Sequence, residues 1–373
     1  METGRIPSAQ WPNPTAEPPD TKGGPVRAMV MDGIGQPLQV REVPDPVPPR
    51  GGVLVRVHAT GLCRSDWHAW VGHDDVSVPH VPGHELAGTV GEVGAGVRGW
   101  SVGDRVTVPF VCGCGRCQWC LSGEAQVCPN QEQPGFTHWG SFAEYVVLHA
   151  ADTNLVAIPE TVSFEAAASL GCRFATAYRA LTGRAQVADG EWVTVLGAGG
   201  VGLSAVMIAT ALGARVVAVD RHPGALAAAE ALGAAHTLVA DGSDIPTRVH
   251  EITNGGSHVA IDAVGSEQTC QDSILSLRRR GRHVQVGLLP PGAGNVHPRV
   301  PMARAIAWEL DLLGSHGMAA ADYPAMLALI DRGVLRPQSL IERVIGLEEA
   351  AALLPALDHA SPAGMTMIDP RRL

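Results

Sequence analysis

The sequence lacks the apolar stretches that membrane insertion requires. No segment of the 373 residues approaches the unbroken apolar run of roughly 20 residues that crosses a bilayer, and residues 1–28 contain no apolar run of the length a signal peptide needs. No membrane association is therefore expected, and the chain is predicted to be cytoplasmic. Residues 1–25, rich in proline and polar side chains, are predicted to form a disordered extension.

A surplus of positive charge is also missing. Lysine and arginine total 27 against 37 aspartates and glutamates, which gives a formal net charge of -10. A surface of this sign repels a phosphate backbone, so no nucleic-acid partner is expected. The basic run RRRGR at 278–282 is interpreted as a helix end, where cations suit the helix dipole and Gly281 can form the C-cap.

Cysteine is scarce outside one short loop. Five of the eight cysteines lie between residues 111 and 128. A chain of this length can bury a core without disulfides, and clustered thiols in a reducing cytosol more often bind metal. The spacing C-x2-C-x2-C-x7-C predicts a structural zinc whose coordination shell is closed by four thiolates. The predicted ligands are Cys114, Cys117, Cys120 and Cys128, and Cys112 is left over.

A glycine motif stands between two predicted strands, at 192–196 and 215–220. Its glycines fit G-x-G-x-x-G, in which the first permits a tight turn, the second admits a pyrophosphate and the third allows close packing of helix and strand. The helix that follows directs unpaired N–H groups at the phosphates. The predicted cofactor-binding residues of this turn are Gly197, Gly199, Gly200, Val201 and Gly202.

Asp220 ends the second of these strands, eighteen residues after Gly202. A carboxylate at this position accepts hydrogen bonds from ribose hydroxyls and repels a 2′-phosphate, so the sequence favours NAD over NADP. Arg221 follows directly and could reach a 2′-phosphate, which keeps NADP as the less favoured alternative.

The remaining pattern divides the chain into two kinds of structure. Strand-like runs at 236–240, 258–265 and 282–288 alternate with helical stretches near 244–253 and 267–280, which predicts a doubly wound parallel sheet. Before about residue 160, short strand-like runs separated by glycine and proline predict a mainly β domain.

Cys63, His84 and Cys172 form a candidate set of ligands for a second zinc. Two thiolates and one imidazole are used where zinc keeps its fourth position open for a substrate oxygen, although only the fold can bring residues so distant in sequence together. Taken singly, each of the three could equally be an ordinary core residue.

Together these segments resemble the zinc-dependent medium-chain alcohol dehydrogenases, from about residue 26 to the C-terminus. The resemblance implies an α/β fold in which a GroES-like domain, formed by 26–173 and 313–373, is interrupted by a Rossmann NAD-binding domain at 174–312. It implies two zinc ions per chain, with Cys63, His84 and Cys172 holding the catalytic one and a structural-zinc lobe at about 111–128. Relatives of this length imply a homotetramer or homodimer.

The same resemblance assigns roles within the string CRSDWH and beyond it. Ser65 and His68 match a relay that carries the proton of the alcohol to the surface, and Asp66 would fix the ring of His84 by a hydrogen bond. Glu85 would approach the metal during ligand exchange. The residues expected to contact the cofactor outside the glycine turn are Arg64 at the pyrophosphate and Thr176 and Leu288 beside the nicotinamide.

The implied reaction is reversible oxidation of a primary or secondary alcohol to an aldehyde or ketone by hydride transfer to NAD. The substrate-pocket candidates are Ser65, Trp67, Phe110 and Trp139, with Leu288 and Trp308 as further candidates. Aromatic rings favour an apolar or aromatic alcohol over a polyol. Another medium-chain zinc dehydrogenase, such as a polyol dehydrogenase, and a non-catalytic protein that binds zinc and NAD remain alternatives.

One position departs from the family pattern. Met365 stands where many relatives carry lysine or arginine toward the cofactor pyrophosphate. The Met365→Arg variant is therefore expected to bind NAD more tightly, by about the contribution of one hydrogen bond, ~1 kcal/mol.

Overall fold

The structure is a computed structural model that describes residues 25–289, 297–358 and 364–372. These residues form two compact units. Unit 1 takes its described residues from Met1–Cys172, Gly317–Arg332 and Pro337–Leu373, and unit 2 from Arg173–His316 and Gly333–Arg336. The extension predicted for 1–25 lies outside the described residues except at its last position. Across the described ranges, no helix combines the length and apolar character needed to cross a membrane.

Unit 1 is built around a mainly antiparallel sheet. The strands of this sheet are β3 (Val53–Leu62), β4 (Glu85–Val93), β5 (Arg105–Thr107), β6 (Tyr145–Leu148), β7 (Val156–Ala157), β14 (Ile341–Ile345) and β15 (Met365–Ile368). They run in the order β14-β15-β3-β4-β5-β7, with β6 pairing beside this path to β3. A separate antiparallel pair consists of β1 (Val26–Val30) and β2 (Gln39–Val43). Along β3, Val53, Val55 and Val57 are fully buried whereas Arg56 is exposed, the alternation expected of a half-buried strand.

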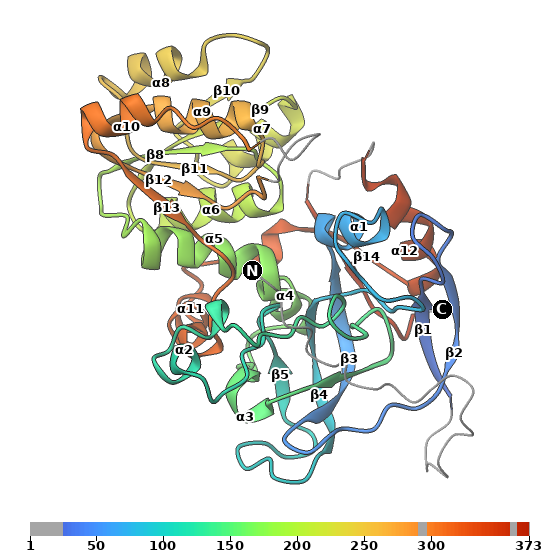
Figure 1. Cartoon of the computed structure of the whole chain (residues 1–373). Coiled ribbons are helices and arrows are strands. Elements are labelled where there is room, and N and C mark those ends of the chain that lie inside the picture. The colour runs from blue at the N-terminus through green and yellow to red at the C-terminus, as the bar shows by residue number, and fades with distance from the viewer. Residues whose placement is uncertain (1–24, 290–296, 359–363, 373) are drawn as a thin grey trace. The chain divides into compact units, whose positions relative to one another are not determined.

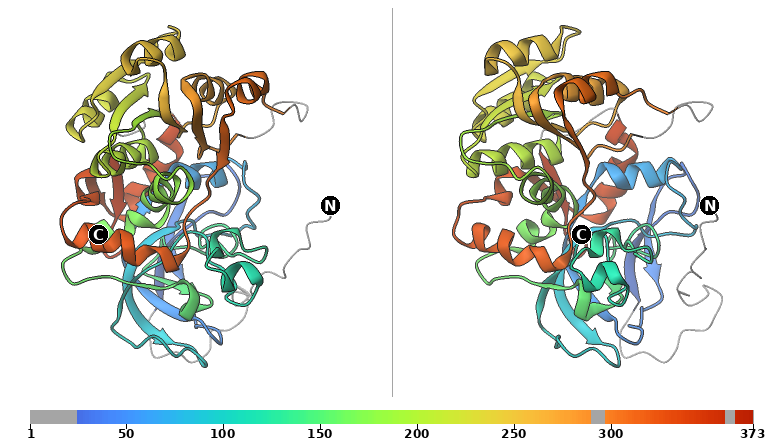
Figure 2. Two further views of the ribbon diagram at one scale, coloured as in Figure 1. Left: turned by 90° about the vertical axis from the view of Figure 1, so that its left-hand side faces the viewer. Right: turned by 60° about the vertical axis from the view of Figure 1, so that its left-hand side comes forward.

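The two ends of the described chain meet in unit 1. β15 pairs with β3, so that Thr366 lies opposite Leu62, and the red C-terminal segments lie among the blue N-terminal ones in Figures 1 and 2. The helices of this unit are α1 (Arg64–Trp70), α2 (Gln118–Leu121), α3 (Ala151–Asn154), α4 (Phe164–Ala168), α11 (Tyr323–Asp331) and α12 (Leu347–Leu353). Because α1 starts immediately after β3, residues 63–70 are held at the end of a buried strand.

Unit 2 contains a six-stranded sheet in which every neighbouring pair is parallel. Its strands are β8 (Trp192–Leu196), β9 (Arg215–Asp220), β10 (His236–Val239), β11 (Ser257–Asp262), β12 (Leu277–Gln285) and β13 (Asp311–Gly314). The order β10-β9-β8-β11-β12-β13 is that of a Rossmann fold, whose ligands bind at the carboxyl ends of the strands.

Helices cover both faces of this parallel sheet. They are α5 (Ala175–Arg179), α6 (Gly200–Ala211), α7 (Pro223–Ala231), α8 (Ile245–Thr253), α9 (Glu267–Leu275) and α10 (Met302–Trp308). In Figure 1, α6 lies on one face and α8 and α9 lie on the other. The sheet is therefore doubly wound, as its alternating sequence pattern predicts.

The interpretation of RRRGR as a helix end is wrong. α9 ends at Leu275, and the arginines belong to β12, whose pairing with β11 shifts register between Ser257 and Val259. Arg280 adopts a left-handed φ of 58° within this irregularity. Arg278, Arg279 and Arg280 are exposed there, so the sheet tolerates their charge without a helix dipole.

Candidate functional site

Four potential metal ligands converge at one point of unit 1. Cys63, His84, Glu85 and Cys172 each place a ligand atom within 4.8 Å of the others. Cys63 is the N-cap residue of α1, and Glu85 is the first residue of β4. Cys172 lies in a π-helical turn at 170–174. The fold thus brings together the three ligands inferred from the sequence, and adds the carboxylate of Glu85.

Asp66 organises this cluster from the first turn of α1. Its Oδ1 lies 2.9 Å from His84 Nδ1, and neither side chain is exposed. The same carboxylate accepts hydrogen bonds from the backbone N–H of Cys63 at 3.0 Å and of Gly83 at 3.1 Å. One buried carboxylate therefore sets the position of two of the potential ligands, as the carboxylate partners of metal-binding histidines do.

His84 has one ring nitrogen left for a metal. Its Nε2 is buried and has no hydrogen-bond partner, a state that costs free energy unless a ligand occupies the position. Burial lowers the pKa of His84, but the charge and hydrogen bond of Asp66 more than compensate, so the pKa is raised well above its ordinary value. Two thiols and this nitrogen make a donor set that suits zinc.

One side of the cluster is less enclosed than the others. Cys63, His84 and Glu85 are buried, whereas Cys172 is partly exposed.

The hydroxyl of Tyr323, a fully buried residue of α11, donates to the carbonyls of Leu170 and Gly171 at 3.4 Å and so supports the turn that carries Cys172.

A chain of polar groups starts beside Cys63. Its Sγ lies 3.8 Å from the hydroxyl of Ser65, and His68 follows one turn along α1. His68 Nδ1 lies 2.9 Å from Nδ1 of His73, an exposed residue that the sequence analysis did not single out. Burial, followed by the charges of His73 and Arg64, lowers the pKa of His68. His73 lies three residues past the end of α1, and no sequence signal marked this position.

Two aromatic rings lie beside His84, and two tryptophans predicted to line the substrate pocket lie elsewhere in unit 1. The ring centroid of Phe110 lies 6.1 Å from that of His84, and the ring of Phe136, which the sequence analysis missed, lies 5.1 Å from it. Trp67 is half-buried on α1, with the guanidinium of Arg64 4.6 Å from its ring centroid. Trp139 donates from its indole N–H to the carbonyl of Pro79 at 3.0 Å.

The second group of metal ligands is the loop of four cysteines. The sulfur atoms of Cys114, Cys117, Cys120 and Cys128 all lie within 4.8 Å of one another. Burial raises the pKa of Cys114, but hydrogen bonds from backbone groups and neighbouring thiols lower it to about 6. Gly115 takes a left-handed φ of 72° inside this loop. Cys112 is buried apart from the four sulfurs, with its thiol donating to the Pro109 carbonyl.

The glycine turn of unit 2 links the carboxyl end of β8 to α6. Gly197 has φ of 90°, and a Cβ on Gly202 would lie 1.7 Å from the carbonyl oxygen of Gly197, so neither position admits a side chain without movement. Gly199 is the N-cap residue of α6, and Gly200 and Val201 form its first turn. The turn therefore has the shape that a pyrophosphate requires.

Asp220 is positioned at the edge of this turn. Its Oδ2 accepts from the backbone N–H of Ala198 at 2.7 Å, and its Oδ1 accepts from that of His222 at 2.8 Å. The carboxylate ends β9 and faces the glycine turn, while Arg221 is exposed.

Comparison with known proteins decides the family. The profile of the alcohol dehydrogenase GroES-like domain matches residues 49–160, and that of the zinc-binding dehydrogenase matches residues 200–332. An alcohol dehydrogenase of Geobacillus stearothermophilus is 40% identical over 270 residues, which cover 71% of this chain and 78% of that relative. The chain belongs to the zinc-dependent medium-chain alcohol dehydrogenase family.

The descriptions of two further relatives name a dinucleotide cofactor. An NAD-dependent alcohol dehydrogenase of Sulfurisphaera tokodaii is 31% identical over 357 residues, which cover 92% of this chain and all of the relative. The crystal structure of a zinc-binding dehydrogenase from Sinorhizobium meliloti 1021 bound to NADP matches with a TM-score of 0.82 and 27% identity, covering 93% of this chain and 100% of that one. The family thus includes members described with either dinucleotide.

The remaining residues expected near the cofactor differ in exposure. Thr176 is buried on α5, and 64% of Leu288 is exposed. Arg173, which the sequence analysis did not name, is a buried arginine whose side chain lies against Gly200. Arg64 is exposed on α1 and donates to the Leu357 carbonyl at 2.8 Å.

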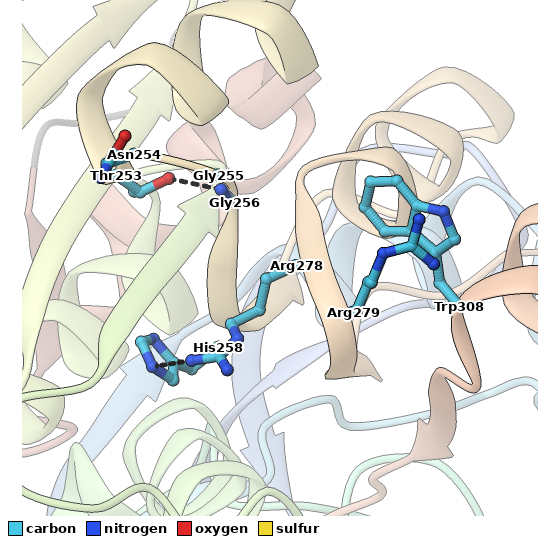
Figure 3. A pocket seen from close by; sticks show the side chains of 8 residues that line it. All are labelled: Thr253, Asn254, Gly255, Gly256, His258, Arg278, Arg279 and Trp308. Atoms are coloured by element: carbon cyan, nitrogen blue, oxygen red, sulfur yellow. Dashed lines mark hydrogen bonds between the residues drawn. The ribbon is translucent and has the colours of Figure 1, made fainter.

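Trp308 lies away from the glycine turn. It lines a cavity of about 370 Å³ in unit 2, shown in Figure 3. The cavity lies at the amino ends of β11 and β12, beside Gly256 and Arg278, whereas the glycine turn follows the carboxyl end of β8. The ring of Trp308 is flanked by the guanidinium groups of Arg279 and Arg304. Trp308 and the glycine turn therefore lie at opposite ends of the strands of unit 2, and a role of Trp308 in the substrate pocket stays a prediction.

Met365 is a core residue of this family member. It is the first residue of β15, is paired with Ile341 and has no exposed surface. The burial of Met365 speaks against the expectation that Met365→Arg tightens NAD binding, because an arginine there would place its charge in the sheet.

Proposed function

We propose that this chain is an NAD-dependent zinc alcohol dehydrogenase that oxidises apolar or aromatic primary and secondary alcohols reversibly to aldehydes or ketones. The observation that carries the proposal is the convergence of Cys63, His84 and Cys172, with Asp66 bonded to one nitrogen of His84 and the other buried without a partner. Family membership supports the same chemistry.

In this proposal Cys63, His84 and Cys172 hold the catalytic zinc, and the four cysteines of the loop hold a structural one. When bound, zinc with three protein ligands supplies a Lewis acid that draws charge from the oxygen of an alcohol or carbonyl. Asp66 keeps His84 in the tautomer that presents Nε2. Glu85 stands close enough to compete for the open position during exchange of substrate.

The proton of the alcohol leaves through side chains of α1 and the loop after it. Ser65 receives it near Cys63, and His68 accepts it further along the helix; in the reverse reaction the same groups return it. His73 extends this path to an exposed imidazole, which exchanges protons with water.

Unit 2 binds the cofactor in this proposal. The glycine turn and the N-terminus of α6 accommodate the pyrophosphate, and Arg173, against Gly200, places a cation beside it. Asp220 is the basis for choosing NAD, since its carboxylate would repel a 2′-phosphate. Thr176 and Leu288 are proposed to flank the nicotinamide.

The substrate class follows from the rings around His84. Phe110 and Phe136 offer apolar surface and little that could satisfy several hydroxyl groups, which disfavours a polyol. The unbridged state of all eight cysteines is consistent with the proposed cytoplasmic location. Assembly as a homotetramer or homodimer is proposed from family membership alone.

An NADH-coupled screen over primary, secondary and aromatic alcohols tests the function. We expect turnover with apolar alcohols, preference for NAD, and loss of turnover in Cys63→Ser with NAD binding retained. Turnover of the same size in Cys63→Ser would reject the zinc site as the catalytic one. A folded, zinc-loaded enzyme inactive on every alcohol and carbonyl would favour the non-catalytic alternative, in which Glu85 closes the shell.

A further inference from the structure

Unit 1 contains a third cluster of metal-binding side chains that the proposed function does not use. Glu132, His138 and His149 each place a ligand atom within 4.8 Å of the others. The ring centroids of the two histidines are 4.9 Å apart, and His149 Nδ1 contacts a carboxylate oxygen of Glu132. None of the three was singled out by the sequence.

Separate segments hold the three residues in place. The backbone of Glu132 exchanges two hydrogen bonds of 2.8 Å with Cys112, at the start of the four-cysteine loop. His138 closes a short loop, with its carbonyl accepting from Gly135. His149 follows β6 directly, and its carbonyl accepts from the side chain of Asn154. Hydrogen bonds to the backbone thus hold all three segments in place.

His138 supplies the observation that points to a ligand. It is 8% exposed, and its buried Nε2 makes no well-formed hydrogen bond, although the ring interacts with the Val147 backbone; Nδ1 lies 3.2 Å from the Thr137 hydroxyl. A buried imidazole nitrogen without a partner is costly and calls for an explanation. The same feature marks His84 in the proposed catalytic zinc site.

We propose that Glu132, His138 and His149 bind a third zinc ion, which joins the four-cysteine loop to β6. Two imidazoles and one carboxylate favour zinc over calcium or magnesium, which prefer oxygen donors. The Glu132 and His149 side chains remain 32% and 20% exposed, so a water molecule can complete the shell. The ion fastens the segment that leaves the cysteine loop to the sheet.

The test measures a difference in zinc content between full-length proteins. Wild type, His138→Asn, His149→Asn and His80→Asn are each loaded with Zn²⁺, dialysed, and analysed for metal per chain. His80 is the matched control, because it is a buried histidine of the same region whose Nε2 donates to the Gly135 carbonyl at 2.8 Å. We expect each cluster variant to lose one equivalent relative to wild type, and His80→Asn to lose none.

Equal zinc content in wild type and both cluster variants would overturn the proposal. If the histidine variants fail to fold, Glu132→Gln and a Co²⁺ titration of the wild-type protein replace them. Cobalt bound here should show ligand-field bands without thiolate charge transfer, in addition to the signal of the cysteine sites, and Glu132→Gln should lose those bands. Detection of cobalt on thiolates alone would reject the site. The difference in zinc content between wild type and variants does not depend on alcohol turnover, so a failure of the proposed function would not affect this test.

Discussion

Asp66 connects the backbone of Cys63 to the ring of His84. Its two carboxylate oxygens accept from the Cys63 N–H at 3.0 Å and contact His84 Nδ1 at 2.9 Å, in a site without solvent exposure. One side chain therefore sets the distance between a thiol and an imidazole that the sequence separates by twenty residues.

Replacing this carboxylate should weaken the proposed catalytic zinc site. In Asp66→Asn the partner of His84 loses its charge and one acceptor, so we expect zinc affinity or turnover to fall roughly 10–100-fold. Metal content under competing chelator and kcat/KM with an apolar alcohol measure the effect. Asp104→Asn, which alters a partly exposed aspartate that accepts from the Ser101 N–H, is the control and should change neither quantity.

His73 should influence the pH dependence of alcohol oxidation. The charge of His73 lowers the pKa of His68, so its removal in His73→Asn should raise that pKa toward the ordinary value. Since His68 must be unprotonated to accept a proton, the acid limb of the kcat profile should move to higher pH. An acid limb at the wild-type position would show that His73 does not act on His68. The exposed His236→Asn variant serves as control.

Asp220 should determine the choice of dinucleotide. Asp220→Asn keeps an acceptor for the Ala198 N–H but removes the charge that repels a 2′-phosphate. We expect the ratio of kcat/KM for NAD over NADP to fall about tenfold, which corresponds to ~1.4 kcal/mol. Asp241→Asn, an exposed aspartate in the same unit that accepts from the Ser243 N–H, should leave the ratio unchanged. An unaltered ratio in Asp220→Asn would assign the preference to another residue.

The four-cysteine loop should stabilise unit 1 through its metal. Cys117→Ser is expected to remove one zinc and to lower the free energy of unfolding by about 3–4 kcal/mol, the stabilisation that a ligand gives at 100 to 1,000 times its Kd. Thermal unfolding with metal analysis measures both. Cys112→Ser makes the same change at a buried cysteine outside the cluster and should retain the full zinc content.

Met365→Arg should destabilise unit 1 because Met365 has no exposed surface. Burying an unpaired guanidinium costs roughly 3–5 kcal/mol, so we expect a lower midpoint in urea and no gain in NAD affinity. Met302→Arg, at a half-exposed methionine of α10, should unfold like the wild type. Tighter NAD binding by Met365→Arg at full stability would contradict the burial argument.

Patterns local in sequence predicted local structure well. The glycine turn and the strands beside it follow from period and composition, because each depends on residues within one supersecondary unit. The segment RRRGR was wrongly assigned to a helix end. Exposed arginines beside a glycine occur both at helix ends and at strand irregularities, so composition alone does not distinguish the two. Only the pairing of β12 with β11 distinguishes them.

Contacts between residues of different loops could not be predicted from the sequence in the same way. Phe136 reaches His84 through loop closure, and Glu132, His138 and His149 have no spacing that marks a metal site. Their convergence depends on the pairing of Glu132 with Cys112 and on where β6 ends. Cys63, His84 and Cys172 could be assigned to one metal site from the sequence only because of the family resemblance, since their spacing alone does not indicate that they lie together.

The pairing of β15 with β3 has a consequence for biosynthesis. During translation Leu62 emerges long before Thr366, whereas every strand of the parallel sheet comes from one uninterrupted stretch of chain. A nascent polypeptide can complete unit 2 while β3 still waits for its final neighbour. The antiparallel sheet is then finished only after β15 has left the ribosome.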